Sequence, residues 1–467
     1  MLHRLLDSPR TYYALAGALL AVAVLSQFEI RPPSRPEGRE AELAGLRTRD
    51  DVNLLFILVD ALRADRLHAY GYARETSPWM DDLARSGVRF AEVLSQSSWT
   101  KCSMASLWTA TYPVRNGILR WGDAMPEGTP LPAEHLRDAG FRTVGIFRNG
   151  WVSANFGFAQ GFQSYIRPVP SVSPQAAHSP RLHERLKGSD EDATVAALEF
   201  LRTYGDERFL LYLHYMDVHQ YTYTEASALF GASYSDAYDN AIRWTDQNIG
   251  VLLQELDQLG LRKRTLVVLA ADHGEEFLEH GREGHAKSLY REVVEVPWIV
   301  SFPFRLEPGA VVETTVENVD IWPTLLDLLG VPALPAADGR SRVPLIEAAL
   351  RNAPGPDRDA PAFAQLEEYW GMPEKPVRPL VSVTEGDYRL ILVGGSGERE
   401  GVELFDHRVD PGEKTNVAAD HPEITARLRE KAAAYLARPA ADWGSPLEVE
   451  ISDLEAGQLR ALGYVVR

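Results

Sequence analysis

An uninterrupted apolar run at Asn53–Val59 most constrains the fold of this chain. Its seven residues, of which Ile57 and Val59 are β-branched, predict a strand that is buried on both faces, as strands of parallel sheets are. Asp60 follows the run directly. A strand of this kind needs helices on both sides of its sheet, so the run predicts an α/β protein.

Strand-like and helix-like segments then alternate along the chain. The alternation predicts a mostly parallel sheet flanked by helices. The segments that carry it are residues 77–87, 88–95, 131–147, 193–217, 236–260, 264–276, 296–303 and 318–330.

The pattern changes after about residue 350, where residues 380–413 predict short strands joined by turns and residues 422–440 predict a closing helix. We therefore expect a small antiparallel C-terminal sheet with a helix. The predicted organisation is an N-terminal segment (1–30), a Pro- and charge-rich linker (31–50), a catalytic domain (51–350) and a C-terminal subdomain (351–467).

The N-terminal segment predicts export. Arg4 and Arg10 precede an apolar stretch at residues 12–25, and Glu29 follows it. This charge distribution places the rest of the chain on the far side of the inner membrane. Two alternatives remain open: an uncleaved anchor in the membrane, or a signal peptide cleaved near Ala21–Ala23.

The composition excludes several functions. The formal net charge is −18, and no cluster of Lys or Arg indicates nucleic-acid binding. An acidic surface repels anions, so an anionic substrate would need a metal, a lysine or a helix N-terminus to hold it. The only cysteine, Cys102, excludes an internal disulfide and a site rich in thiolates.

Potential metal ligands follow several of the predicted strands. Asp60, the turn at Thr100, residues 214–219 and the pair Asp272–His273 all reach the carboxyl edge of the sheet, where ligands bind in such folds. Carboxylates and an imidazole suit one divalent ion such as Zn²⁺, Mn²⁺, Mg²⁺ or Ca²⁺.

Thr100 is the candidate nucleophile. It lies at a predicted helix start, where free N–H groups favour an anion, and a metal would activate its hydroxyl. The alternative is that Thr100 only caps the helix. We expect Cys102 to be a small buried apolar residue. Lys101 and Lys287 are either solvated or balance a bound oxyanion.

Six stretches of the sequence together resemble the bacterial sulfatase family of the alkaline phosphatase superfamily. They are NLLFILVDALRADRLHAYGY, SSWTKCSMASLWTATYPVRNGI, HYMDVHQY, AADHGEEFLEHG, VPWIVSFP and NVDIWPTLLDLLG. The C-terminal stretches LFDHRVDPGEKTNVA and LEAGQLRALGYV are also similar to that family.

The resemblance implies roles for nine residues. It implies that Asp60, Thr100, Asp272 and His273 hold one divalent metal, and that His219, His285, Lys101 and Lys287 contact the substrate. Asn149 falls near a further substrate position. It also implies the alkaline-phosphatase-like α/β fold with a small C-terminal sheet.

The chain departs from the family at the nucleophile. Members that cleave sulfate esters carry Cys or Ser in a Cys-x-Pro-x-Arg signature that becomes formylglycine, whereas this chain has Thr-Lys-Cys-Ser-Met at residues 100–104. Ala61 replaces a usual aspartate and His273 a usual asparagine. These changes resemble the branch that acts on phosphoesters or phosphonates through threonine.

We therefore expect attack of Thr100 on phosphorus, a phospho-threonine intermediate, and protonation of the leaving group by His219 or His285. Transfer of the group to water or to another alcohol is open. Two other functions remain alternatives: hydrolysis of a sulfate ester without formylglycine, and non-catalytic binding of an anionic glycan or lipid headgroup by an exported protein.

Overall fold

The computed structural model describes most of the chain, with gaps. The described residues are 13, 35–168, 188–356, 360–372, 374–393, 401–451 and 456–457. The apolar stretch at residues 12–25 lies outside them except for Tyr13, so the predicted anchor or signal peptide is not described. Within the described ranges, no helix combines the length and hydropathy that crossing a membrane requires.

The centre of the molecule is an eight-stranded sheet with the order β12-β2-β11-β8-β1-β7-β5-β6. β1 (Asn53–Val59) pairs in parallel with β7 (Phe209–Tyr215) and with β8 (Thr265–Ala270). Every residue of these three strands is buried, as the apolar runs predict. β5 (Arg142–Phe147) and β6 (Ser164–Ile166) continue the parallel pairing beyond β7.

The other side of the sheet is mixed. β11 (Trp298–Ser301) runs antiparallel to β8 and to β2 (Val88–Phe90), and β12 (Ala310–Val312) runs parallel to β2. The single strand predicted at residues 88–95 is divided, because β3 (Val93–Leu94) leaves the main sheet and pairs with β13 (Val316–Glu317). The prediction of a mostly parallel sheet is confirmed.

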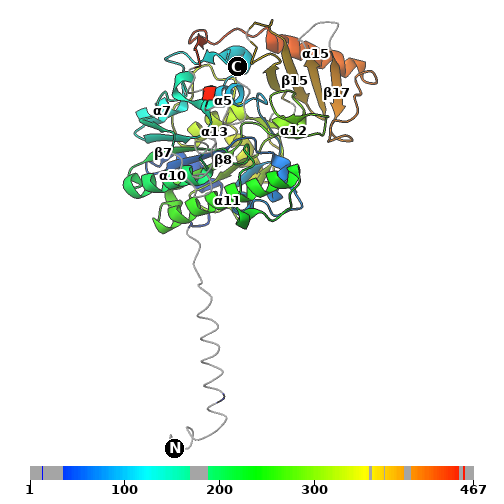
Figure 1. Cartoon of the computed structure of the whole chain (residues 1–467). Coiled ribbons are helices and arrows are strands. Elements are labelled where there is room, and N and C mark those ends of the chain that lie inside the picture. The colour runs from blue at the N-terminus through cyan, green and yellow to red at the C-terminus, as the bar shows by residue number, and fades with distance from the viewer. Residues whose placement is uncertain are drawn as a thin grey trace, which may run out of the picture.

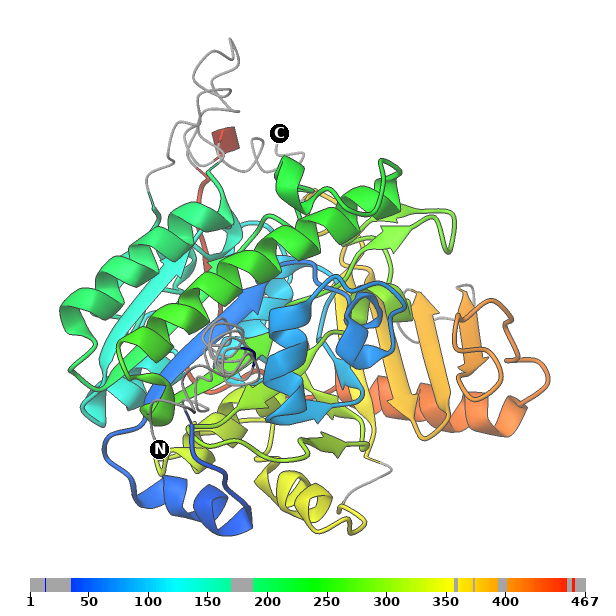
Figure 2. The same cartoon turned by 90° about the horizontal axis from the view of Figure 1, so that it is seen from below.

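Helices cover both faces of this sheet (Figure 1). α10 (Asp190–Tyr204) and α11 (Tyr234–Gln258) lie side by side on one face, which Figure 2 shows from below. α5 (Thr100–Thr109) and α13 (Ile321–Leu328) pack together on the other. Layers of this kind bury most of both faces of the sheet.

A smaller antiparallel sheet follows, with the order β14-β15-β16-β17, and the prediction of such a sheet is confirmed. α15 (Pro422–Leu436) packs on it, and the two share a separate apolar core that includes Leu404, Leu428 and Tyr435. Its strands are β14 (Ala362–Glu367), β15 (Pro379–Glu385), β16 (Tyr388–Val393) and β17 (Val402–Asp406). The division of the chain at residues 350/351 stays a prediction.

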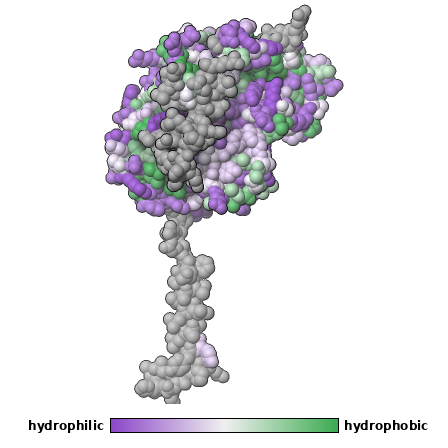
Figure 3. All heavy atoms as spheres, in the orientation of Figure 1, coloured by the Kyte–Doolittle hydropathy of each residue, from purple (hydrophilic) through white to green (hydrophobic). Residues whose placement is uncertain are grey.

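Residues 35–50, within the predicted linker, pack against the large domain. α3 (Glu40–Gly45) buries Leu43, and the Arg35 guanidinium donates to Ser301 Oγ at 2.9 Å. Among the described residues visible in Figure 3, hydrophilic side chains are widespread at the rim, with apolar patches between them. The remaining short elements are α4 (Pro78–Arg85), α6 (Pro113–Asn116), α7 (Pro132–Asp138), α12 (Arg291–Val294), α14 (Val343–Leu350), β4 (Asp123–Ala124), β9 (Glu276–Phe277), β10 (Glu283–Gly284) and β18 (Leu447–Glu448).

Candidate metal centre and active site

The four predicted metal ligands lie close together at the carboxyl edge of the sheet. Asp60 directly follows β1 and Asp272 follows β8, and the two strands are in register, with Leu58 opposite Ala270. Ligand atoms of Asp60, Asp272 and His273 all lie within 4.8 Å of one another. Thr100 is the first residue of α5, and its Oγ1 lies 3.0 Å from His273 Nε2.

The buried carboxylates show that this group of residues fits a cation. Asp60 Oδ1 and Asp272 Oδ2 have no hydrogen-bond partner among the described residues, and both side chains have no exposed surface. His273 Nε2 lies 3.7 Å from the first oxygen and 3.4 Å from the second. Burial and the neighbouring Asp60 raise the pKa of Asp272 to about 6. A divalent cation would relieve this repulsion and satisfy both oxygens.

The other oxygen of each carboxylate is held by donors. Asp272 Oδ1 accepts from the backbone N–H groups of Ala61 at 3.1 Å and His273 at 3.0 Å. Asp60 Oδ2 is 2.6 Å from Asn149 Nδ2 and 2.9 Å from His214 Nε2. Each carboxylate is therefore oriented with one oxygen toward the shared space, as outer hydrogen bonds orient metal ligands.

Asn149 and His214 contribute to the site through Asp60. We predicted Asn149 as a substrate contact, and in the structure its amide donates to the carboxylate of Asp60. His214 was expected at the carboxyl edge within residues 214–219 but without a role of its own. It lies on β7 beside β1 and accepts a hydrogen bond from Tyr212 Oη at 2.8 Å. The parallel pairing of the two strand ends is the signal that would have placed it next to Asp60.

His219 and His285 lie beside the proposed metal ligands. The ring of His285 stacks on that of His273 at 4.3 Å and contacts that of His219 at 4.9 Å. Burial lowers the pKa of His219 to about 4 and the pKa of His285 well below its usual value, so both rings are neutral near pH 7. An anion bound against them would raise both pKa values.

Sequence reasoning missed Glu275, which contacts this histidine pair. Its Oε2 lies 3.1 Å from His285 Nδ1, and burial raises its pKa to about 7. The carboxyl group fixes the orientation of the His285 ring. Glu275 follows the Asp272–His273 pair by two residues, and this closeness could have indicated a role in the site. Glutamates are frequent on exposed loops, however, so the position alone did not distinguish it.

The two predicted lysines differ. Lys287 is exposed, and its Nζ donates to the carbonyl of Glu283 at 2.7 Å. Lys101 is fully buried; its Nζ donates to the carbonyls of Trp121 and Asp123 and lies 4.2 Å from the ring centre of Phe156. Burial lowers the pKa of Lys101 well below its usual value. In this structure its amino group therefore faces backbone carbonyls and aromatic rings.

Cys102 is buried in α5, and burial raises the pKa of its thiol to about 12. A protonated, buried thiol is unreactive, in agreement with the sequence-based expectation. Of the two candidates Thr100 and Cys102, Thr100 is the one whose side chain lies against His273.

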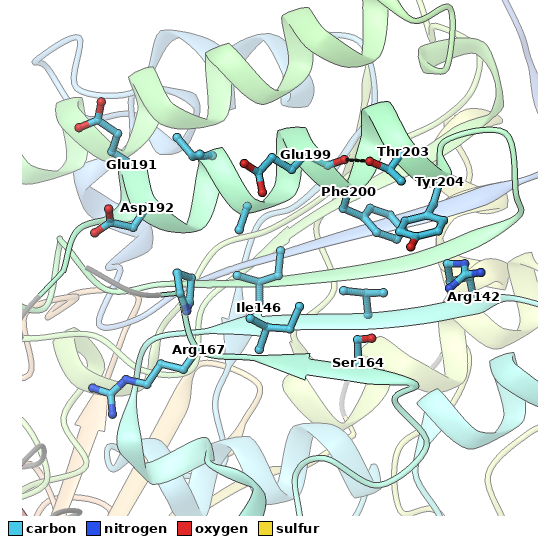
Figure 4. Close-up of a pocket in the computed structure, with 15 residues that line it drawn as sticks. Arg142, Ile146, Ser164, Arg167, Glu191, Asp192, Glu199, Phe200, Thr203 and Tyr204 are labelled. Atoms are coloured by element: carbon cyan, nitrogen blue, oxygen red, sulfur yellow. Dashed lines mark hydrogen bonds between the residues drawn. The ribbon is translucent and has the colours of Figure 1, made fainter. Parts of the chain in front are cut away.

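A large cavity lies away from the ligands. It measures about 750 Å³ and is bounded by α10, β5 and β6, with Phe200, Tyr204 and Ile146 forming apolar walls (Figure 4). Neither Thr100 nor Asp272 lines it.

Comparison with known proteins identifies relatives of the chain. The sequence model of the Sulfatase family matches residues 52–331, and that of the N-sulphoglucosamine sulphohydrolase C-terminal domain matches residues 279–437. Steryl-sulfatase of Rattus norvegicus is 34% identical over 414 residues, which cover 65% of this chain and 72% of that protein.

Two further matches cover different shares of the chain. Arylsulfatase K of Mus musculus is 32% identical over 187 residues, so the chain spans about a third (33%) of that relative. The crystal structure of the phosphonate monoester hydrolase of Agrobacterium radiobacter superimposes with a TM-score of 0.69 at 19% identity. That match covers 85% of this chain and 100% of the other, and it shows a shared fold.

Proposed function

Because the chain belongs to the sulfatase family of hydrolases, we propose that it cleaves an anionic ester with Thr100 as nucleophile and one divalent metal at Asp60, Asp272 and His273. One observation carries this proposal: Thr100 Oγ1 lies 3.0 Å from His273 Nε2, beside two buried carboxylate oxygens that lack partners among the described residues. A threonine that served only as a helix cap would not need these neighbours.

The tautomer of His273 supports its role as a metal ligand. Its Nδ1 lies 2.9 Å from the carbonyl oxygen of Gly274, so Nδ1 carries the proton and donates it. Nε2 then has a free electron pair for the proposed metal, and the hydroxyl of Thr100 lies 3.0 Å from this nitrogen. When bound, a divalent cation supplies positive charge that lowers the pKa of a neighbouring hydroxyl and neutralises anionic oxygens.

The reaction has two steps. In the first, the proton of Thr100 Oγ1 passes to solvent and Oγ1 bonds to the phosphorus or sulfur atom, while the bond to the leaving oxygen breaks. That oxygen takes a proton from His219 or His285, whose ring is protonated because the bound anion raises its pKa. In the second, a water or alcohol oxygen bonds to the same atom and gives up its proton to that histidine, while the bond to Oγ1 breaks and Oγ1 takes a proton from solvent.

The site also offers groups that bind the substrate's oxygens. His219 and His285 donate N–H groups once a bound anion has raised their pKa values and the rings are protonated, and Lys287 supplies a positive charge from the adjacent loop. The backbone N–H groups at the start of α5 face the same region and favour an anion. We assign Lys101 a supporting role, because its amino group is engaged by the carbonyls of Trp121 and Asp123.

We favour a phosphoester or phosphonate as the substrate because residues 100–104 lack the sequence signature for formylglycine. A sulfate ester is the second candidate, since the steryl-sulfatase and arylsulfatase K relatives are named for sulfate esters.

The test compares turnover of bis(4-nitrophenyl) phosphate and 4-nitrophenyl sulfate by the wild type, Thr100→Ala and Thr109→Ala. Thr109 is a matched control, because it is buried at the other end of α5, where its hydroxyl bonds to Ala105 and Thr111. We expect Thr100→Ala to lose about 10³-fold or more in kcat/KM, as enzymes do without their nucleophile. We expect Thr109→Ala to retain activity.

Wild-type turnover by Thr100→Ala would exclude threonine as the nucleophile. Preference for the sulfate would select the second substrate class. An inert, metal-free wild type would contradict the enzyme proposal as a whole.

A further inference from the structure

A second group of metal-type ligands lies in the segment that follows the Asp272–His273 pair. It consists of Glu276 on β9, His280, and Glu292 on α12. One ligand atom from each lies within 4.8 Å of the others. The chemistry proposed above uses none of these three residues.

Glu276 is the most unusual member of this group. It has no exposed surface, and neither of its carboxylate oxygens has a hydrogen-bond partner among the described residues. A buried carboxyl group in this state calls for a counter-charge.

His280 has the orientation of a metal-binding histidine. Its Nε2 lies 2.8 Å from the backbone carbonyl oxygen of Glu413, so Nε2 carries a proton and donates it. Nδ1 and Glu292 Oε1 lie 2.6 Å apart and share a hydrogen bond, so a bound cation would take the place of the proton between them. A histidine that ligates a metal usually donates its other N–H to a carbonyl or carboxylate, as Nε2 does here to Glu413. The ring is held further by stacking on Tyr290 at 3.6 Å.

A cavity borders this cluster at Glu292. It measures about 310 Å³, and Glu292 forms part of its wall. Two arginines in the wall already have partners, because Arg63 pairs with Asp65 at 2.7 Å and Arg291 pairs with Glu295. The third cation of the wall, Lys414, donates to the backbone carbonyl of Glu279.

We propose that Glu276, His280 and Glu292 bind a second divalent cation of the zinc or manganese class, distinct from the one at Asp60. Two carboxylates and one imidazole form a donor set that suits these ions, and a water from the cavity would complete the coordination. The three ligands bracket residues 281–291, which carry His285 and Lys287. The cation thus fixes the two ends of a loop that supplies groups to the proposed active site.

The same cation links the two sheets of the molecule. Through His280 it contacts the backbone of Glu413, whose side chain accepts from His407 Nε2 at 2.7 Å and from the backbone of Arg291 at 2.8 Å. Residues 406–413 follow β17 of the small sheet, whereas Glu292 follows the Asp272 loop of the large one. Bound metal therefore stabilises the contact between them.

The test counts metal in the full-length protein. Chelator-stripped protein is dialysed against Zn²⁺, or against Mn²⁺ in parallel, and bound metal per chain is measured by mass spectrometry. We expect about two equivalents in the wild type and about one in both Glu276→Gln and Asp272→Asn. Glu367→Gln is the matched control, because Glu367 is also buried and has one carboxylate oxygen without a partner among the described residues, but it is not part of either proposed metal site. We expect Glu367→Gln to keep both equivalents of metal.

Circular dichroism shows which variants fold. If Glu276→Gln does not fold, Glu292→Gln is measured in its place. As a second measurement, Zn²⁺ raises the Tm of Asp272→Asn but not that of Asp272→Asn/Glu276→Gln. The proposal is overturned if folded Glu276→Gln and Glu292→Gln bind as much metal as the wild type. If metal is lost from Glu276→Gln but kept at wild-type level by Asp272→Asn, the second site stands and the metal of the proposed function fails.

Discussion

The hydrogen bond from Asn149 to Asp60 makes the orientation of a metal ligand testable. Asn149 Nδ2 lies 2.6 Å from Asp60 Oδ2, and neither residue has exposed surface. In Asn149→Ala this donor is lost, and His214 remains on the same oxygen at 2.9 Å. The Asp60 carboxylate then rotates more freely, and Oδ1 is no longer held toward His273.

The magnitude follows from the type of bond. A hydrogen bond to a charged group contributes about 1.5–3 kcal/mol, and about 1.4 kcal/mol corresponds to a tenfold change in affinity. We therefore expect the affinity for a divalent cation at this site to fall by about 10- to 100-fold, the range seen when outer-shell partners of metal ligands are removed.

The assay is a competition titration of Zn²⁺ against a chromogenic chelator. Asn116→Ala is the matched control, since Asn116 is also a buried amide that donates to Ser106 Oγ and Thr111 O, both at 3.1 Å, and has no contact with Asp60. Both variants lose buried hydrogen bonds, so we expect a similar loss of stability. The loss of metal affinity is expected for Asn149→Ala alone.

Wild-type zinc affinity in a folded Asn149→Ala variant would refute this reasoning. Equal weakening in Asn116→Ala would do so as well, because the effect would then be a general consequence of destabilisation. To keep the second cation from obscuring the result, the titration is repeated in the Glu276→Gln background.

Two further predictions concern stability. Arg148 bridges the buried carboxylates of Asp190 at 2.7 Å and Asp217 at 2.6 Å, so we expect Arg148→Met to lower the free energy of unfolding by about 3–5 kcal/mol. Arg202→Met, at an ion pair whose arginine is 59% exposed, loses less than about 1 kcal/mol in the same urea titration; similar losses would contradict the argument. Burial raises the pKa of Asp246 to about 7 from 3.8, so the unfolded chain ionises first and stability declines as the pH rises from about 4 to 7. Urea titrations between pH 4 and 8 should show a weaker decline for Asp246→Asn, and an unchanged slope would disprove the shift.

The sequence predicts the frame of the site well. Asp60 and Asp272 end apolar strands, and strands of that kind can only be central and parallel in a sheet covered by helices. Their carboxylates therefore have to meet at one edge. Thr100 follows for a similar reason, because a hydroxyl between a strand and a helix lies at the same edge.

Side-chain direction is what the sequence does not specify. Lys101 and Thr100 are adjacent, yet their side chains point to different places. The Lys101 amino group donates to the carbonyls of Trp121 and Asp123, whereas the Thr100 hydroxyl faces His273. Partners such as Asn149 and His214 lie 89 and 154 residues from Asp60, and no local pattern records such pairs. The reversal of β11 also depends on chain connections that periodicity does not encode.

The register in which β1 pairs with β8 decides whether this site forms during folding. Successive side chains of a strand point to opposite faces, so displacing β8 by one position against Leu58–Ala270 would turn one carboxylate away from the other. Partly docked or misaligned forms of the sheet therefore cannot bind the proposed cation, so its binding would stabilise only the correctly paired sheet.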